Sequence, residues 1–108
     1  MRRGDVVTVA ASGDYGKPRP AIILQTDAIP TAHASVVIVQ CTTHLEASDL
    51  RVTLDPTPAN GLQSVSQVMA DKPVTIHRRR IGRIIGRVTN EEIARIAAIT
   101  AFTIGLSD

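Results

Sequence analysis

The segment GKPRPAIILQ, residues 16–25, places an arginine between two prolines at the start of an apolar run. Pro18 and Pro20 restrict the backbone on both sides of Arg19, so its side chain can be aimed at a ligand with little loss of entropy. A guanidinium offers planar, forked donors that match phosphate oxygens. Arg19 is therefore a candidate phosphate-binding group. The alternative is a structural arginine, paired with Asp14 or with a loop carbonyl.

A second set of candidate groups lies in QCTTHLE, residues 40–46, just after the most strongly predicted strand. The hydroxyls of Thr42 and Thr43 can hydrogen-bond a phosphate, and His44 can move a proton near neutral pH. The alternative is that the threonines occur there only because they favour β-strands, and that His44 is an exposed loop residue. For His44 we favour this alternative on sequence grounds.

The cations are unevenly placed, although the net charge is only +2. Residues 72–87, KPVTIHRRRIGRIIGR, carry six basic side chains and no acidic one. A patch of this kind attracts phosphate backbones. The alternative is a solvated strand and turn, and the composition alone does not separate the two.

No metal site is expected from the cysteines and histidines. Cys41 is the only cysteine, which excludes an intramolecular disulfide. His33, His44 and His77 are scattered without helical spacing, whereas a catalytic zinc usually needs three protein ligands.

The chain also lacks an obvious membrane or export signal. No apolar run approaches the roughly 20 residues that a membrane-spanning helix needs. The N-terminus has only a short apolar stretch, and an acid follows its arginines almost directly. We therefore predict a cytoplasmic protein.

The length of 108 residues suits a single domain covering residues 1–108. Runs rich in β-branched residues, separated by clusters of turn residues, predict strands at 5–10, 20–25, 35–42, 51–54, 63–70 and 82–89. Thr89 stands three residues before Glu92, a capping-box spacing, and predicts a helix that ends near Gly105. Short strands with one terminal helix predict a mainly β fold, a strongly bent sheet or partly open barrel.

Five segments in order resemble the MazF/PemK family of toxins from bacterial toxin–antitoxin pairs. They are RRGDVVTV, GKPRPAIIL, VVIVQCTT, NGLQSVSQV and IGRIIGRV, followed by the final helix. The resemblance covers nearly the whole chain. It implies a small SH3-like barrel of the CcdB/MazF type with a C-terminal helix, assembled as a homodimer.

The same resemblance implies a function. Most such toxins are sequence-selective endoribonucleases, or mRNA interferases, that cut single-stranded RNA without a metal or other cofactor and arrest growth. The 2′-OH of the substrate attacks, which leaves a 2′,3′-cyclic phosphate and a 5′-OH. The implied partner is a type II antitoxin whose C-terminal segment occupies the RNA-binding surface.

By position, Arg19 matches the catalytic arginine of the family and Thr42 its catalytic threonine. Asp14 lies where relatives often carry an acidic loop residue, and Asp71 matches an acid implicated in some members. Where some relatives have an arginine two residues before that acid, this chain has Met69. Attack by the 2′-OH builds negative charge on a pentacovalent phosphorane, which a guanidinium and a hydroxyl can stabilise. The general acid and base stay open among Asp14, Asp71, His44 and Arg19 itself.

The RNA-binding surface is expected to include cations, hydroxyls and one loop aromatic on which a base can stack. The predicted set is Lys17, Tyr15, Thr43, His44, Arg78 and Arg79. Arg80, in the same basic run, is expected to brace the fold instead.

Two other function classes compete with this prediction. One is an inactive barrel of the same fold that acts by binding a protein, as related toxins poison DNA gyrase; Arg19 and Thr42 favour cleavage over it. The other is a generic SH3-like interaction module. Such modules use aromatic-lined grooves, and the only aromatic residues here are Tyr15 and Phe102.

Overall fold

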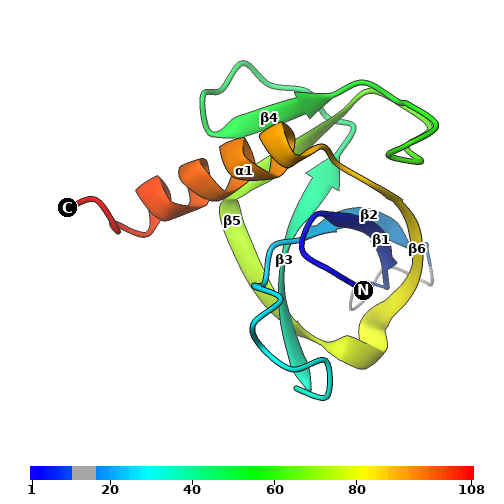
Figure 1. The fold of residues 1–108 in the computed structure, drawn as a ribbon. Coiled ribbons are helices and arrows are strands. Elements are labelled where there is room, and N and C mark those ends of the chain that lie inside the picture. Colours follow the sequence, from blue (N-terminus) through cyan, green and yellow to red (C-terminus); the bar gives the residue numbers. More distant parts are fainter. Residues whose placement is uncertain (11–16) are drawn as a thin grey trace.

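The computed structural model describes residues 1–10 and 17–108 (Figure 1). Six strands and one helix make up most of this part of the chain. The strands are β1 (Asp5–Val9), β2 (Arg19–Ile23), β3 (Ser35–Thr42), β4 (Arg51–Leu54), β5 (Ser66–His77) and β6 (Ile81–Arg87). A 3-10 turn, η1 (Arg78–Arg80), joins β5 to β6, and α1 (Asn90–Thr103) follows.

The strands form one antiparallel sheet in the order β4-β5-β3-β2-β1-β6. The sheet curls strongly, so that β6 comes round beside β1 while α1 lies across β4 and β5 (Figure 1). β4 and β6 are the two ends of the strand order, so hydrogen bonding between strands does not close a full barrel. The predicted fold, mainly β, small, barrel-like and with a C-terminal helix, is confirmed.

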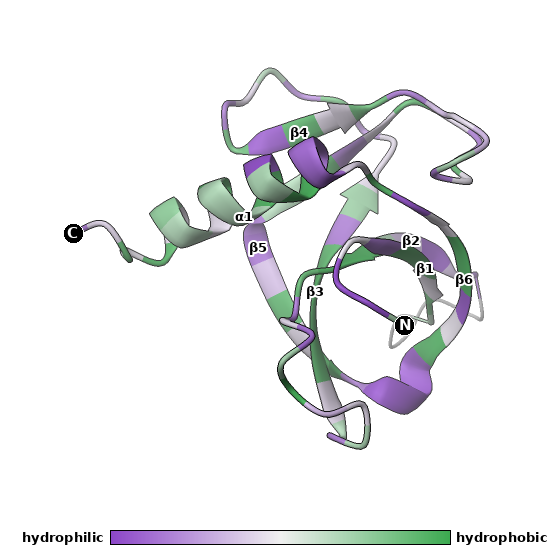
Figure 2. Ribbon diagram, in the orientation of Figure 1, coloured by the Kyte–Doolittle hydropathy of each residue, from purple (hydrophilic) through white to green (hydrophobic). Residues whose placement is uncertain are grey.

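Apolar side chains lie on both faces of this sheet, because consecutive residues of a strand point to opposite sides. In β1, Val6 belongs to a cluster that also includes Ile93 and Ile96 of α1. Its neighbour Val7 belongs to a second cluster, enclosed by the curl of the sheet, with Ile38. Figure 2 shows the apolar residues following the central strands and polar ones gathered at η1. With so few aromatics, valine, isoleucine, leucine and alanine fill both clusters.

The helix starts as its sequence predicts. The hydroxyl of Thr89 accepts a hydrogen bond from the Glu92 backbone N–H, and the Glu92 carboxylate accepts one from the Thr89 N–H, which completes the capping box. In the buried face of α1, the Thr100 hydroxyl donates to the carbonyl of Ala70 at 2.6 Å and ties the helix to β5. The last helical residue is Thr103, and Gly105 follows with a positive φ of 79°.

β5 runs seven residues beyond its predicted end at Ala70. The added stretch contains Pro73, a residue that cannot donate to a ladder. β4 pairs with β5 only as far as Met69, and beyond this residue no other strand of the described ranges pairs with β5 on that side. Pro73 pairs with Val39 of β3, and its missing N–H costs nothing where it faces the unpaired side.

β5 also begins three residues later than predicted, at Ser66. The boundaries of β1, β2 and β6 differ from the predicted ones by at most two residues, and those of β3 and β4 match. No helix in the described ranges is long and apolar enough to cross a bilayer.

Candidate functional site

A cavity of about 440 Å³ opens where the start of β2, the segment before β5 and β6 meet. Two cations, three polar side chains and a proline ring are prominent in its wall: Lys17, Arg83, Thr43, Gln63, Ser64 and Pro20. The cavity can thus offer positive charge, hydrogen-bonding groups and apolar contact to one ligand. That combination suits a nucleotide, which has a charged phosphate and a flat base.

Arg19 stands at the edge of this cavity. It is the first residue of β2, it is exposed, and it lies between Pro18 and Pro20, which both line the cavity. It pairs with Val9 of β1. The ladder keeps the backbone of Arg19 in place, so its guanidinium starts from a fixed point at the rim.

Thr42 ends β3 on the neighbouring strand. Ala21 pairs with Gln40 and Ile22 with Val39 in the β2–β3 ladder. Continued by two residues, this register sets Arg19 opposite Thr42. The two predicted catalytic residues, 23 positions apart in sequence, are therefore brought to the same end of two adjacent strands.

One lone pair of the Thr42 hydroxyl is already used in a hydrogen bond. Its Oγ1 accepts a hydrogen bond from the backbone N–H of His44 at 3.1 Å. A hydroxyl has one proton to donate and two acceptor lone pairs. With one lone pair engaged by His44, the hydroxyl of Thr42 keeps its proton for donation to a second group.

The next two residues differ in placement. Thr43 lines the cavity. His44 points to solvent with 82% of its side chain exposed, and its Nε2 is 3.8 Å from the carboxylate of Glu46. The structure thus places His44 as an exposed loop residue, which is the alternative that the sequence favoured.

The segment that forms the cavity rim before β5 is held by a buried asparagine. Oδ1 of Asn60 accepts from the N–H groups of Thr57 and Leu62, each at 3.0 Å, and its Nδ2 donates to the Asp55 carbonyl at 2.8 Å. Gly86 of β6 lies against this turn, since a Cβ there would come within 2.3 Å of the Asn60 carbonyl carbon. Gln63 and Ser64 therefore project from a fixed turn.

Asp71 does not lie beside Thr42. Thr42 pairs with Gln67, and Asp71 lies four residues further along β5, about 13 Å at the usual strand rise. Its Oδ2 accepts a 2.8 Å hydrogen bond from the Lys72 ammonium, which lowers the pKa of the carboxyl below its usual 3.8. Its Oδ1 is buried with no partner among the described residues. At neutral pH Asp71 is a carboxylate that can accept a proton but has none to give.

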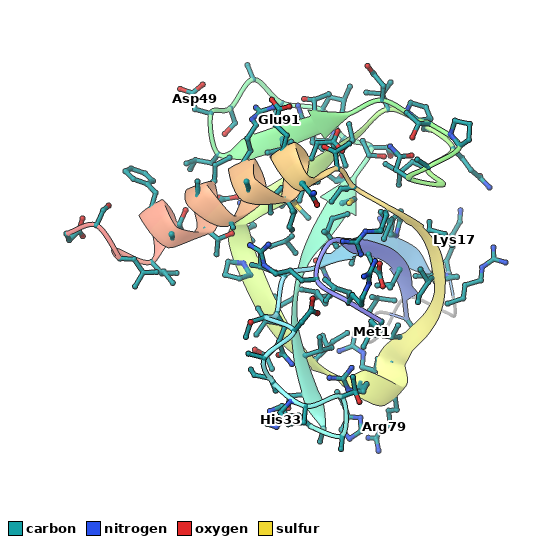
Figure 3. All side chains as sticks on the ribbon, viewed as in Figure 1. Met1, Lys17, His33, Asp49, Arg79 and Glu91 are labelled. Carbon is teal, nitrogen blue, oxygen red and sulfur yellow. The ribbon has the colours of Figure 1, made fainter. Side chains whose placement is uncertain are left out.

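Arg78 and Arg79 lie at the other end of β5 from Gln67. The Nε of Arg78 donates to the His33 carbonyl at 2.9 Å, and its side chain borders a separate cavity of about 200 Å³ with Arg2. Figure 3 shows Arg79, a residue of η1, well apart from Lys17 on the flank of the molecule. Neither arginine lines the cavity beside Arg19.

Other cations of the basic run serve the fold. Arg87 binds the buried carboxylate of Asp5 at 2.7 Å, and that carboxylate also accepts from the Arg2 N–H. The Nε of Arg80 donates to the Ala10 carbonyl at 2.8 Å, as expected for a bracing residue. Of this run, only Arg83 lines the larger cavity.

Sequence reasoning missed Arg83, Gln63 and Ser64 as individual site residues. The only sequence signal for Arg83 was its place in the basic run. Its role depends on how β6 meets β1: the Arg83 N–H donates to Thr8 Oγ1 at 3.1 Å, and a Cβ on Gly82 would lie 2.5 Å from the same oxygen. Thr8 also lines the cavity, so this close approach turns Arg83 toward it.

Two predicted residues, Asp14 and Tyr15, lie outside the described part of the chain. Cys41 is described and buried, and burial raises the pKa of its thiol to about 12, which makes it a poor nucleophile at neutral pH.

Comparison with known proteins places this arrangement in a family. Residues 2–101 match the family model of the PemK-like, MazF-like toxin of type II toxin-antitoxin systems. The chain belongs to this family. The resemblance seen in five sequence segments is thereby confirmed for nearly the whole length of this MazF-like chain.

Individual relatives agree. The chain is 45% identical over 97 residues to a protein of Mycolicibacterium smegmatis named "Probable endoribonuclease MazF", covering 88% of each. A solved endoribonuclease from a mycobacterial species, in complex with its cognate antitoxin, is 27% identical with a TM-score of 0.80 over 98% of this chain and 96% of that one. The MazE–MazF structure from Deinococcus radiodurans shares the fold at 20% identity, with a TM-score of 0.80 over 97% and 95%.

Proposed function

We propose that this MazF-like chain is the toxin of a type II toxin–antitoxin pair and acts as a metal-independent endoribonuclease on single-stranded RNA. One observation carries the proposal: the antiparallel pairing of β2 and β3 brings Arg19 and Thr42 to the same end of two adjacent strands, beside a cavity lined by Lys17 and Arg83. The mycobacterial relatives named as endoribonucleases support the same activity.

The cavity suits one nucleotide and its flanking phosphates. Lys17 and Arg83 supply charge for the backbone. Gln63, Ser64 and Thr43 carry donors and acceptors for a base edge, and Pro18 and Leu62 provide apolar contact. Tyr15 remains the predicted stacking residue. Which base enters the cavity depends on the polar groups that project from the turn before β5.

The proposed reaction is an internal transesterification. The 2′-oxygen loses its proton and forms a bond to the adjacent phosphorus, while the bond from phosphorus to the 5′-oxygen breaks and that oxygen takes up a proton. Negative charge grows on the phosphorane oxygens in between. The Arg19 guanidinium and the Thr42 proton are donors for those oxygens, and preorganised donors of this kind typically supply about 10²–10³ in rate each.

The reaction needs a general base for the 2′-OH and a general acid for the 5′-oxygen. Asp71 is a carboxylate at neutral pH because of Lys72, so it suits a base and not an acid. Its position along β5 favours a role at some distance from Thr42. Asp14 is a candidate base and Arg19 a candidate acid, and we favour both over His44, whose side chain is 82% exposed.

We also propose a homodimer in the cytoplasm and a cognate antitoxin that binds over the cavity. The support for the antitoxin is the mycobacterial endoribonuclease solved with its cognate antitoxin. A partner that covers the positive rim would block RNA directly, which is the simplest form of neutralisation.

The test is cleavage of a mixed-sequence single-stranded RNA in EDTA, with Arg19→Ala alongside. The expected result is cuts at a recurring motif that end in a 2′,3′-cyclic phosphate and are lost in Arg19→Ala. Arg95→Ala, an exposed arginine of α1 remote from the cavity lining, is the matched control and should cleave like the parent. Absence of cleavage by the folded parent would contradict the proposal and favour a barrel that acts by binding a protein.

A further inference from the structure

Gln67 has an unusually complete set of hydrogen bonds for a buried side chain. It is only 7% exposed. Its Oε1 accepts from the Glu46 N–H at 2.9 Å and from Arg51 at 3.0 Å. Its Nε2 donates to the Glu46 carbonyl at 2.9 Å and to the Thr53 hydroxyl at 3.2 Å. A carboxamide has two donors and two lone pairs, and all four are used here.

Arg51 extends this network toward the end of β3. Its side chain is 10% exposed and lies 3.4 Å from the Glu46 carboxylate. The same nitrogen that donates to Gln67 also donates to the carbonyl of His44 at 2.9 Å. Gln67 and Arg51 together therefore hold the backbone of both His44 and Glu46; we call this pair the loop clamp.

The clamp reaches Thr42 through His44. The His44 carbonyl is held by Arg51, and the His44 N–H is the group that donates to Thr42 Oγ1. Gln67 also lies directly opposite Thr42 in the β3–β5 ladder. Holding the His44 backbone thus keeps its N–H on Thr42 Oγ1, and this restricts the directions that remain for the hydroxyl proton.

The packing of the core does not account for the clamp. Residues 43–49 are all exposed, and none of them belongs to either apolar cluster. Burying an amide and a guanidinium is unfavourable unless every polar atom is bonded. Here a buried amide and a largely covered guanidinium hold an exposed segment, and that segment contacts Thr42 through the N–H of His44.

We propose that Gln67 and Arg51 are positioning residues for RNA cleavage, which set the direction in which Thr42 donates its proton to the phosphate. This inference rests on the proposed function. Without the clamp, the segment 43–49 can leave its position, and the Thr42 hydroxyl rotates among several partners. The cost then appears in the transition state, where the donor is needed, and much less in substrate binding.

The test is a double-mutant cycle between Gln67→Met and Thr42→Val, read as kcat and KM. Gln67→Met alone is expected to lower kcat by at least ~10-fold and to change KM by less than ~2-fold. In the Thr42→Val background, the same change should lower kcat by less than ~2-fold, because the donor it positions is already gone. An equal loss in both backgrounds, or no loss in the parent, overturns the proposal.

Thr53→Val is the matched control. It removes the one hydrogen bond of Gln67 that points away from the loop, keeps the volume and β propensity of the residue, and should leave kcat unchanged. Should Gln67→Met fail to fold, Arg51→Lys replaces it in the cycle, since an ammonium keeps the charge but loses the planar fork. The same pattern of coupling is expected, and additive losses again overturn the proposal.

Hydrogen exchange separates a failure of this inference from a failure of the proposed function. If the parent cuts no RNA, the activity assignment is wrong. The clamp is then judged by the backbone amides of His44 and Glu46, which should exchange at least ~10-fold faster in Gln67→Met than in the parent. Unchanged protection of both amides would overturn the clamp, whatever the activity.

Discussion

Thr42 and Gln67 face each other across β3 and β5, and each is bonded to the turn that follows Thr42. The threonine at the strand end accepts from His44, and the glutamine holds Glu46 two residues further on. Thr42, which we propose contacts the substrate, thus lies opposite the buried carboxamide of Gln67 on the neighbouring strand. The position of the proposed hydroxyl donor therefore depends on the hydrogen bonds of a buried side chain.

Removing the Thr42 donor should affect rate far more than stability. Thr42→Val keeps the β-branched shape but loses the hydroxyl. We expect kcat to fall by about 10²–10³, the typical loss for one preorganised donor, with the melting temperature close to that of the parent. Single-turnover cleavage and thermal unfolding measure the two effects. A variant that melts normally and cleaves at the parental rate would remove Thr42 from the mechanism.

The two groups of cations should contribute differently to RNA binding. Each phosphate contact on a single strand steepens the dependence of log K on log salt by about 0.7. Lys17→Ala with Arg83→Ala should therefore reduce the slope by about 1.4, because both side chains line the cavity. Fluorescence titration of a short, uncleavable RNA at several salt concentrations measures the slope.

The comparison pair for that experiment is Arg78→Ala with Arg79→Ala. These residues belong to the predicted RNA-binding set but lie at the opposite end of β5 from Gln67. A smaller change in slope than for Lys17 and Arg83 is expected. A larger one would mean that the RNA runs along η1 and not through the cavity.

The ion pair between Asp5 and Arg87 should matter for folding. The Asp5 carboxylate is buried, and it is bonded to both Arg87 and the Arg2 N–H. Asp5→Ala leaves a partly buried guanidinium without its partner, so we expect a loss of about 3 kcal/mol in the free energy of unfolding. Urea denaturation measures it. Asp49→Ala, at an exposed loop position, is the control and should stay within about 0.5 kcal/mol; equal effects would refute the role of the pair.

The lowered pKa of Asp71 predicts that the stability of the fold depends on pH. Its pKa is lower in the folded protein than the usual 3.8, because Lys72 stabilises the charged form. A lowered pKa stabilises the fold above the unfolded value, and this contribution disappears as the pH falls through the folded value. Asp71→Asn should therefore be less stable than the parent at pH 6, with the difference shrinking below about pH 4.

Thermal melts of the parent and Asp71→Asn from pH 7 down to pH 2.5 test this dependence. Asp49→Asn serves as the exposed control. A difference that stays constant through the acidic range would show that Asp71 contributes by shape and not by charge.

Local sequence was sufficient for much of the fold. The run of β-branched residues within 35–42 predicted β3 to the residue, since such residues favour buried strands. The spacing of Thr89 and Glu92 predicted the start of α1, because capping is a local hydrogen-bond pattern. By contrast, β5 continues to His77 because β3 pairs with it as far as Ser35, and no local pattern near Pro73 records that pairing.

The sequence by itself determined the mainly β class, the family and the two candidate residues Arg19 and Thr42, since these follow from residue types and their order. Tertiary structure alone decided which cations line the cavity. Arg83, Arg87 and Arg79 look alike in one basic run, yet Arg83 lines the cavity, Arg87 binds Asp5 and Arg79 belongs to η1. The role of a charged side chain depends on which groups lie within a few ångströms of it. Strand pairing and β-bulges decide this, because they bring together residues that are far apart in the chain.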